Sequence, residues 1–206
     1  MSNLRENQIY GPFRLAYLNV FTPRGSKVNP EKPKEYSVML MIPKEPTAQC
    51  PDPAAELAAL RASVMECVRE KFGDKAKGVK NPIKDGDLET NIDGSPKYPG
   101  YWFLNTSCRE GYPPILIDGD QCKVTTEGLW VSGDWGKVKV KFWAYDTAAN
   151  KGVSAGLRAI QFLYKDTPLG SSYDHESAAN EFGRVENADK PTYTANSDDY
   201  DPFADE

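Results

Sequence analysis

Histidine and closely spaced cysteines are almost absent from this sequence. The only histidine is His175, and the four cysteines, at positions 50, 67, 108 and 122, show no C-x-x-C spacing. Structural zinc sites are built from four Cys or His ligands that usually include closely spaced pairs. We therefore expect no zinc site and no cofactor. The acidic turns described below are another pattern that could hold a metal, and we expect none there either.

Long hydrophobic runs are also lacking. There is no apolar segment at the N-terminus, and no segment is long and apolar enough to span a bilayer. We expect neither secretion nor a membrane partner, and hence a cytoplasmic protein whose thiols are reduced. A chain of 206 residues can bury a sizeable core, and one domain with a tail is expected rather than two full domains.

Basic residues are fewer than acidic ones overall, and the two kinds are unevenly distributed along the chain. The net charge is −5, yet residues 165–206 hold eleven acidic residues against three basic ones, a net charge of −8, which leaves +3 on residues 1–164. We predict a mildly basic folded domain over residues 1–165 and an acidic tail over residues 166–206. From position 170 onward, Leu, Ile, Val and Phe are represented only by Phe182, Val185 and Phe203, so the tail is expected to be disordered.

The segment from Trp135 to Tyr145 alternates two chemically different faces, as a β-strand does. The predicted core face carries Gly136, Val138, Val140, Phe142 and Ala144. The opposite face carries Trp135, Lys137, Lys139, Lys141, Trp143 and Tyr145. Its side chains are spaced by about 6.6 Å, close to the phosphate step of an extended nucleic-acid strand, and its rings are suited to stacking on bases. The alternative is an exposed strand kept soluble by lysines. The large outward aromatic residues favour a binding platform.

Other segments contribute further candidate contacts. A Pro-rich loop over residues 22–34 carries Arg24, Lys27 and Lys34, and the segment after a predicted helix carries Lys77 and Lys80. Arg158 lies in the strand predicted over residues 152–164, where Ala155 and Gly156 would leave room for a base, and Tyr101 belongs to an aromatic cluster at residues 98–103. The alternatives are solvated loops, lysines that interact with a helix dipole, and small residues at a bend of a barrel.

The order of the predicted elements favours a mainly β fold. Strands are expected over residues 9–21, 36–42, 98–106, 115–117, 123–125, 129–131, 135–145 and 152–164. The one convincing helix begins at Asp52, with Pro53 in its first turn, and ends at Gly73. Short antiparallel strands with a single helix indicate an OB-fold-like barrel capped by that helix. Only two clear strands precede the helix, where the usual order has three, so either the first strand bends into two or the helix is displaced.

Two acidic turns suggest a different function. Asp85 and Asp87 flank Gly86, and Asp118 and Asp120 flank Gly119. Paired carboxylates of this kind can hold Mg²⁺ for phosphodiester cleavage, which would make the protein a metal-dependent nuclease. Asp-Gly is also a very common turn signal, and neither pair lies beside a candidate Lys or His base. We therefore do not expect an enzyme.

Four segments resemble phage-encoded single-stranded DNA-binding proteins of the OB-fold kind. These are residues 19–24 (NVFTPR), 36–44 (YSVMLMIPK), 152–161 (GVSAGLRAIQ) and the end of the tail, Asp198, Asp199, Tyr200, Asp201, Pro202 and Phe203. The resemblance covers nearly the whole domain and the tail. It implies a protein that coats single-stranded DNA during phage replication and recombination in the infected bacterium, without sequence preference or catalysis. It also implies that the tail recruits replication or recombination proteins. The negative charge of the tail indicates in addition that it competes with nucleic acid for the basic domain and so regulates binding.

The residues alone leave two questions open. An aromatic face can equally meet another protein, so a phage structural or assembly adaptor remains an alternative. Stacking and phosphate contacts do not by themselves sense a 2′-hydroxyl, so RNA is not excluded as a partner.

Overall fold

The structure is a computed structural model that describes residues 8–25 and 29–170. In this part of the chain there is one α-helix, α1 (Pro53–Phe72), followed by the short 3₁₀ helix η1 (Gly73–Lys75). The strands are β1 (Ile9–Arg24), β2 (Glu35–Pro43), β3 (Ile83–Asp85), β4 (Tyr101–Arg109), β5 (Ile115–Ile117), β6 (Trp135–Asp146) and β7 (Lys151–Tyr164). No helix of the described residues is long and apolar enough to cross a membrane.

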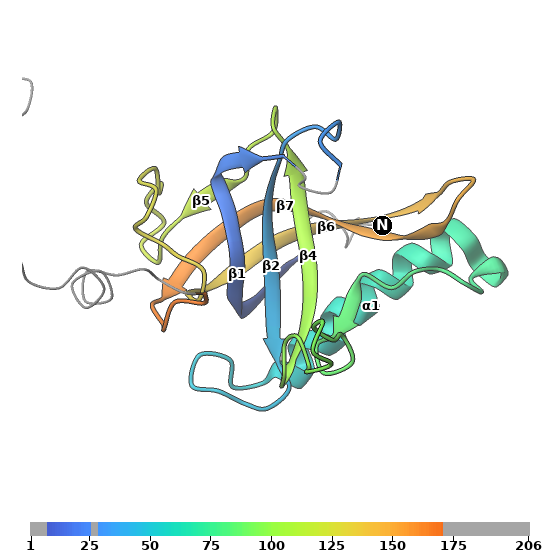
Figure 1. The fold of residues 1–206 in the computed structure, drawn as a ribbon, viewed down its shortest axis with the longest axis horizontal. Coiled ribbons are helices and arrows are strands. Elements are labelled where there is room, and N and C mark those ends of the chain that lie inside the picture. Colours follow the sequence, from blue (N-terminus) through green and yellow to red (C-terminus); the bar gives the residue numbers. More distant parts are fainter. Residues whose placement is uncertain (1–7, 26–28, 171–206) are drawn as a thin grey trace, which may run out of the picture. The chain divides into compact units, whose positions relative to one another are not determined.

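Five of the strands form a closed barrel. The sheet order β4-β2-β1-β6-β7 is closed by a parallel pairing between Ser107 of β4 and Gly156 of β7. The short strand β3 extends the sheet beside β4, and β5 pairs with β7. Figure 1 shows the long strands β1, β2, β4, β6 and β7 curving around one another, with α1 to one side. The predicted OB-like class is confirmed.

Helix α1 follows the second barrel strand rather than the third. Asp52 caps its start by accepting a hydrogen bond from the backbone N–H of Ala55 (3.0 Å), and Gly73, with φ +50°, ends it. The helix buries Leu60, Val64, Cys67 and Val68 in the main core. Because α1 lies between β2 and β4 in the chain, the second of the two alternatives raised by the sequence is correct and the helix is displaced.

Strand β1 does not keep one alternation of faces along its length. The sequence predicts Phe13, Leu15 and Tyr17 on one face, with Leu18 and Val20 on the other. Phe13 and Leu15 are buried, but the pairing with β2 shifts register after Ala16 and Tyr17 takes a positive φ of 49°. Beyond this bulge Val20 is in the core and Leu18 packs against it, while Tyr17 is 58 % exposed. A bulge adds one residue and thereby exchanges the two faces.

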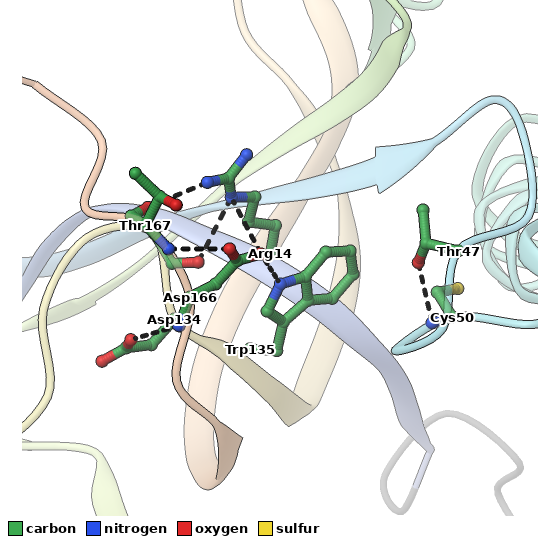
Figure 2. A network of polar contacts seen from close by, with 8 residues as sticks. Arg14, Thr47, Cys50, Asp134, Trp135, Asp166 and Thr167 are labelled. Carbon is green, nitrogen blue, oxygen red and sulfur yellow. Dashed lines mark hydrogen bonds and ion pairs between the residues drawn. The ribbon is translucent and has the colours of Figure 1, made fainter.

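Trp135 is buried, so its predicted place on the binding platform is wrong. It shares a face with its Cα partners Arg14 and Tyr164, but it is only 2 % exposed because the segment at Asp166 covers it. The indole Nε1–H donates a hydrogen bond to Oδ2 of Asp166 (2.7 Å). Arg14 lies at 4.0 Å from the same carboxylate oxygen and donates to the carbonyl of Thr167 (2.9 Å), as Figure 2 shows. Residues 166–167, which directly follow the predicted domain, are thereby held against the barrel.

The short predicted strands have mixed outcomes. Residues 115–117 form β5, residue 123 makes only an isolated bridge with Ile117, and residues 129–131 form no strand. Strand β3, in the basic segment after the helix, was not predicted from the sequence, because three residues are too few to show periodicity.

Candidate nucleic-acid interface

The outward face of β6 carries the predicted row of cations. Lys137 is exposed and Lys139 and Lys141 are half-buried, while Val138, Val140 and Phe142 between them lie in the core. Trp143 continues the row with 45 % of its side chain exposed. The alternation predicted for residues 137–143 therefore holds, and it places ammonium groups and one large ring along a single face.

A groove runs beside this row. Two adjoining surface pockets, of about 670 and 500 Å³, share Tyr112, Lys141, Leu157 and Arg158. The first pocket also contains Lys139, and the second contains Trp143 and Arg109. We call the two pockets together the β6–β7 groove. The groove combines cations, which can contact the phosphates of a single nucleic-acid strand, with aromatic rings on which its bases can stack.

The ring of Trp143 is positioned by the glycine on the neighbouring strand. A methyl group at Gly156 would lie only 2.6 Å from Cζ3 of Trp143, so the ring occupies the space above the glycine backbone. Ala155 is buried in the core. The protein's own indole therefore fills the space that the sequence suggested for a base at Gly156, and Ala155 offers no space because it is part of the core.

Tyr145 and Lys80 lie at the far end of the β6–β7 hairpin. The segment at Lys80 pairs with the hairpin, with N–H···O distances of 2.9 Å from Lys80 to Lys151 and 3.1 Å from Val153 to Lys80. The hydroxyl of Tyr145 and the side chain of Lys80 both approach Gly152. Lys77 is exposed in the same segment. The basic segment after the helix is thus paired with β7 near the tip of the hairpin.

The remaining predicted residues do not enter the groove. Tyr101 packs on a separate cluster with Met39, Met41 and Phe103. It lies six residues from Ser107 along β4, or about 20 Å at 3.3 Å per residue. Arg24 lines a different pocket, and Lys34 is exposed in the loop between β1 and β2. Lys27 and the tail residues 198–203 lie outside the described residues.

Sequence reasoning missed Arg109 and Tyr112 in the groove. Arg109 ends β4, and the N–H of Tyr112 donates to the carbonyl of Arg109 (2.9 Å) in the turn that follows. Tyr112 is 70 % exposed. A turn has no periodicity that predicts which of its side chains point outward. Only the parallel contact between β4 and β7 in the structure shows that this turn lies beside the groove. The one available signal was an aromatic residue beside Gly111 and Pro113 in an otherwise polar turn.

The acidic turns have structural contacts of their own. The Lys44 ammonium donates to carboxylates of Asp85 (2.5 Å) and Asp87 (2.6 Å), and Asp87 also accepts from the N–H of Gly100 (2.7 Å). The hydrogen bond from Lys44 lowers the pKa of Asp87, and those to Asp85 and Asp87 raise the pKa of Lys44. Asp118 accepts from the N–H groups of Asp120 and Cys122 in its own turn. Among the described residues, no three metal-ligating side chains gather into a cluster.

The comparisons with known proteins agree with this fold. The family model described as Enterobacter phage Enc34, ssDNA-binding protein, matches residues 7–192. No curated protein gives a significant match.

Several solved structures share the architecture. One is the single-stranded DNA-binding protein from bacteriophage Enc34 in complex with ssDNA, with 18 % identity, a TM-score of 0.62, and coverage of 77 % of this chain and 86 % of that chain. Another is gp2.5, a single-stranded DNA-binding protein encoded by bacteriophage T7, with 16 % identity, a TM-score of 0.51, and coverage of 87 % and 99 %. At these identities the structures establish the shared fold, and the family model, which spans most of the sequence, establishes the relationship. The chain belongs to the family of the Enterobacter phage Enc34 ssDNA-binding protein.

Proposed function

We propose that this protein binds single-stranded DNA without sequence preference, through the β6–β7 groove and the outward face of β6. The observation that carries the proposal is the position of Trp143, exposed in the groove beside Lys141 and Arg158. Stacking on a ring accepts any base, and lysine or arginine contacts to phosphate carry no sequence information. The family and the fold support the same ligand.

Duplex DNA is a poorer fit to the proposed site. Bases in a duplex are already stacked on each other and present only their edges, so Trp143 and Tyr112 gain nothing from them. A single strand can unstack and place its bases on the rings while its phosphates follow the lysines of β6. Lys80 and Lys77 would extend this phosphate path beyond the tip of the hairpin.

The biological role that we propose is the coating of single-stranded DNA exposed during phage replication or recombination, without catalysis. In this proposal residues 1–165 form the binding domain. The acidic tail, residues 166–206, competes with DNA for the basic surface and presents Asp198, Asp199, Tyr200, Asp201, Pro202 and Phe203 to replication or recombination proteins. Both roles rest on the charge division of the sequence and on the family.

A binding and cleavage assay tests the proposal directly. Labelled single-stranded DNA, duplex DNA and single-stranded RNA are incubated with the full chain, with and without Mg²⁺, and run on native and denaturing gels. We expect a shift of single-stranded DNA at lower protein concentration than duplex, with no cleavage. Cleavage in Mg²⁺ would support the nuclease instead, and no shift of any nucleic acid would support the adaptor. The RNA lanes determine whether binding depends on the sugar.

A further inference from the structure

The strained residue Tyr17 adjoins a second surface pocket. Tyr17 sits at the β1 bulge with a φ of 49°, a left-handed conformation that is uncommon for a bulky residue and that glycine or asparagine adopts more easily. Its ring is 58 % exposed, so burial of the ring does not explain why a tyrosine stands there. Strain of this kind gathers at binding sites, where it aims a side chain at a ligand.

The exposed ring of Tyr17 is held in place by its neighbours. The Tyr98 hydroxyl donates to the Tyr17 hydroxyl at 3.3 Å, and Tyr98 packs edge-to-face on Phe103 with ring centroids 4.9 Å apart. Burial, and then this hydrogen bond, raises the pKa of Tyr98, so its hydroxyl keeps its proton at neutral pH. A flat ring fixed outward in this way loses little conformational entropy when a base stacks on it.

The adjoining pocket repeats the chemistry of the β6–β7 groove. It has a volume of about 540 Å³ and lies between Tyr17, the basic loop residues Arg24 and Lys32, and the polar side chains of Asn19 and Ser37. Lys32 forms an ion pair with Glu35 at 3.0 Å, which neutralises the one carboxylate among the pocket residues. A ring and a guanidinium therefore flank a cavity that also offers amide and hydroxyl groups for hydrogen bonds.

The Tyr17 pocket and the β6–β7 groove lie near each other at one end of the barrel. Arg24 of β1 is the Cα partner of Glu35 of β2, and Glu35 is the Cα partner of Arg109 of β4, which lines the groove. Two strand spacings of about 4.8 Å place Arg24 about 10 Å from Arg109, a distance that one or two nucleotides can bridge. Figure 1 shows the ends of β1 and β4 and the start of β2 at the same end of the barrel.

We infer that the pocket at Tyr17 is a second nucleotide subsite, which takes a base of the same DNA strand on the Tyr17 ring and its phosphate at Arg24. This inference rests on the proposed function and extends it. A strand that fills the β6–β7 groove continues past Arg109 onto the outer face of β1 and β2. Short oligonucleotides occupy the groove alone, and longer ones occupy both sites.

The test compares two oligothymidylates, about 5 and about 20 nucleotides long, on the wild type and on three variants. Tyr17→Asn removes the ring and suits the left-handed backbone, and Tyr17→Phe keeps the ring. Arg24→Gln removes the proposed phosphate contact away from the bulge. We expect Tyr17→Asn and Arg24→Gln to weaken binding of the longer strand at least fivefold and to leave the shorter unchanged. Tyr17→Phe should bind both like the wild type, and Tyr17→Asn should melt no lower than the wild type.

The outcomes separate this inference from the proposed function. If Tyr17→Asn and Arg24→Gln bind both lengths like the wild type while Trp143→Ala weakens both, the groove binds DNA and the second subsite does not exist. An equal loss for both lengths in Tyr17→Asn would also overturn the second subsite. If Trp143→Ala has no effect on either length, it is the proposed groove that fails.

Discussion

The indole of Trp143 lies over Gly156 on the adjacent strand, where even a methyl group would come within 2.6 Å of Cζ3. Gly156→Ala should therefore displace the ring from the groove and weaken single-stranded DNA binding by on the order of 1 kcal/mol, the lower range of a lost base stack. Fluorescence titration with oligothymidylate measures the effect. Gly119→Ala is the matched control, because nothing lies near a methyl group at that position. Equal affinities for the two variants would mean that the position of the ring does not matter.

The two tryptophans of β6 should respond to substitution in opposite ways. Trp135 is 2 % exposed and Trp143 is 45 % exposed. Trp135→Ala should lower the free energy of unfolding by about 3–5 kcal/mol, as for other buried aromatic residues. Trp143→Ala should change stability by only about 0.5 kcal/mol while weakening binding of every base composition by about 1–3 kcal/mol. Urea unfolding and DNA titration of both variants measure this. A large loss of stability in Trp143→Ala would show that its ring is a packing element.

Alternation along β6 predicted the lysine face and Trp143 correctly, because period-2 patterns report burial wherever pairing is regular. The same rule failed beyond Tyr17, where a register shift exchanges the faces and no residue pattern marks it. Nor could alternation show that the segment at Asp166 covers Trp135. The barrel class also followed from the sequence, as did the helix with its cap at Asp52. The groove did not, because it depends on a parallel contact between β4 and β7, two strands far apart in the chain. Its residues Arg109 and Tyr112 stand in a turn whose direction only the assembled barrel determines.

Binding through the cationic face of β6 should depend steeply on salt. If about four to six phosphates are contacted, the slope of log K against log salt should be about −3 to −4, from about 0.7 per contact on single strands. Titrations at several ionic strengths give this slope. Arg158→Gln should reduce it by about 0.7, since Arg158 lines the groove. A salt-independent affinity would contradict the groove as the DNA site.

The Asp166 carboxylate should make stability depend on pH. The hydrogen bond from Trp135, and then that from the Thr167 backbone, lower the pKa of Asp166 below its ordinary value. A lowered pKa in the folded state stabilises the fold above the unfolded-state pKa of about 3.9, and this contribution disappears as pH falls through the folded-state pKa.

The variant Asp166→Asn keeps an acceptor for Trp135 but does not titrate. The wild type should therefore be more stable than Asp166→Asn at pH 7, with the difference constant down to about pH 5 and shrinking below about pH 4. Urea unfolding across this range measures it, and a constant difference down to pH 3 would exclude the carboxylate charge as its cause.

The acidic segment after position 170 should compete with DNA for the basic surface. Residues 171–206 carry ten acidic and two basic residues, a net charge of −8. Leu169, just before them, packs on the outer cluster of Ala16, Met39 and Phe103, so the segment is tethered to the body of the barrel. A tethered polyanion acts at an effective concentration in the millimolar range, and its attraction to lysines weakens as salt screens it. Removing residues 171–206 should therefore raise single-stranded DNA affinity several-fold at low salt and much less at high salt, with thermal stability unchanged.

Titration of the full and truncated chains at two ionic strengths measures the effect. A control chain with the ten acidic residues of the segment replaced by Asn or Gln separates charge from length, and should bind as the truncated form does. Equal affinities of the full and truncated chains at low salt would show that the segment does not reach the DNA site.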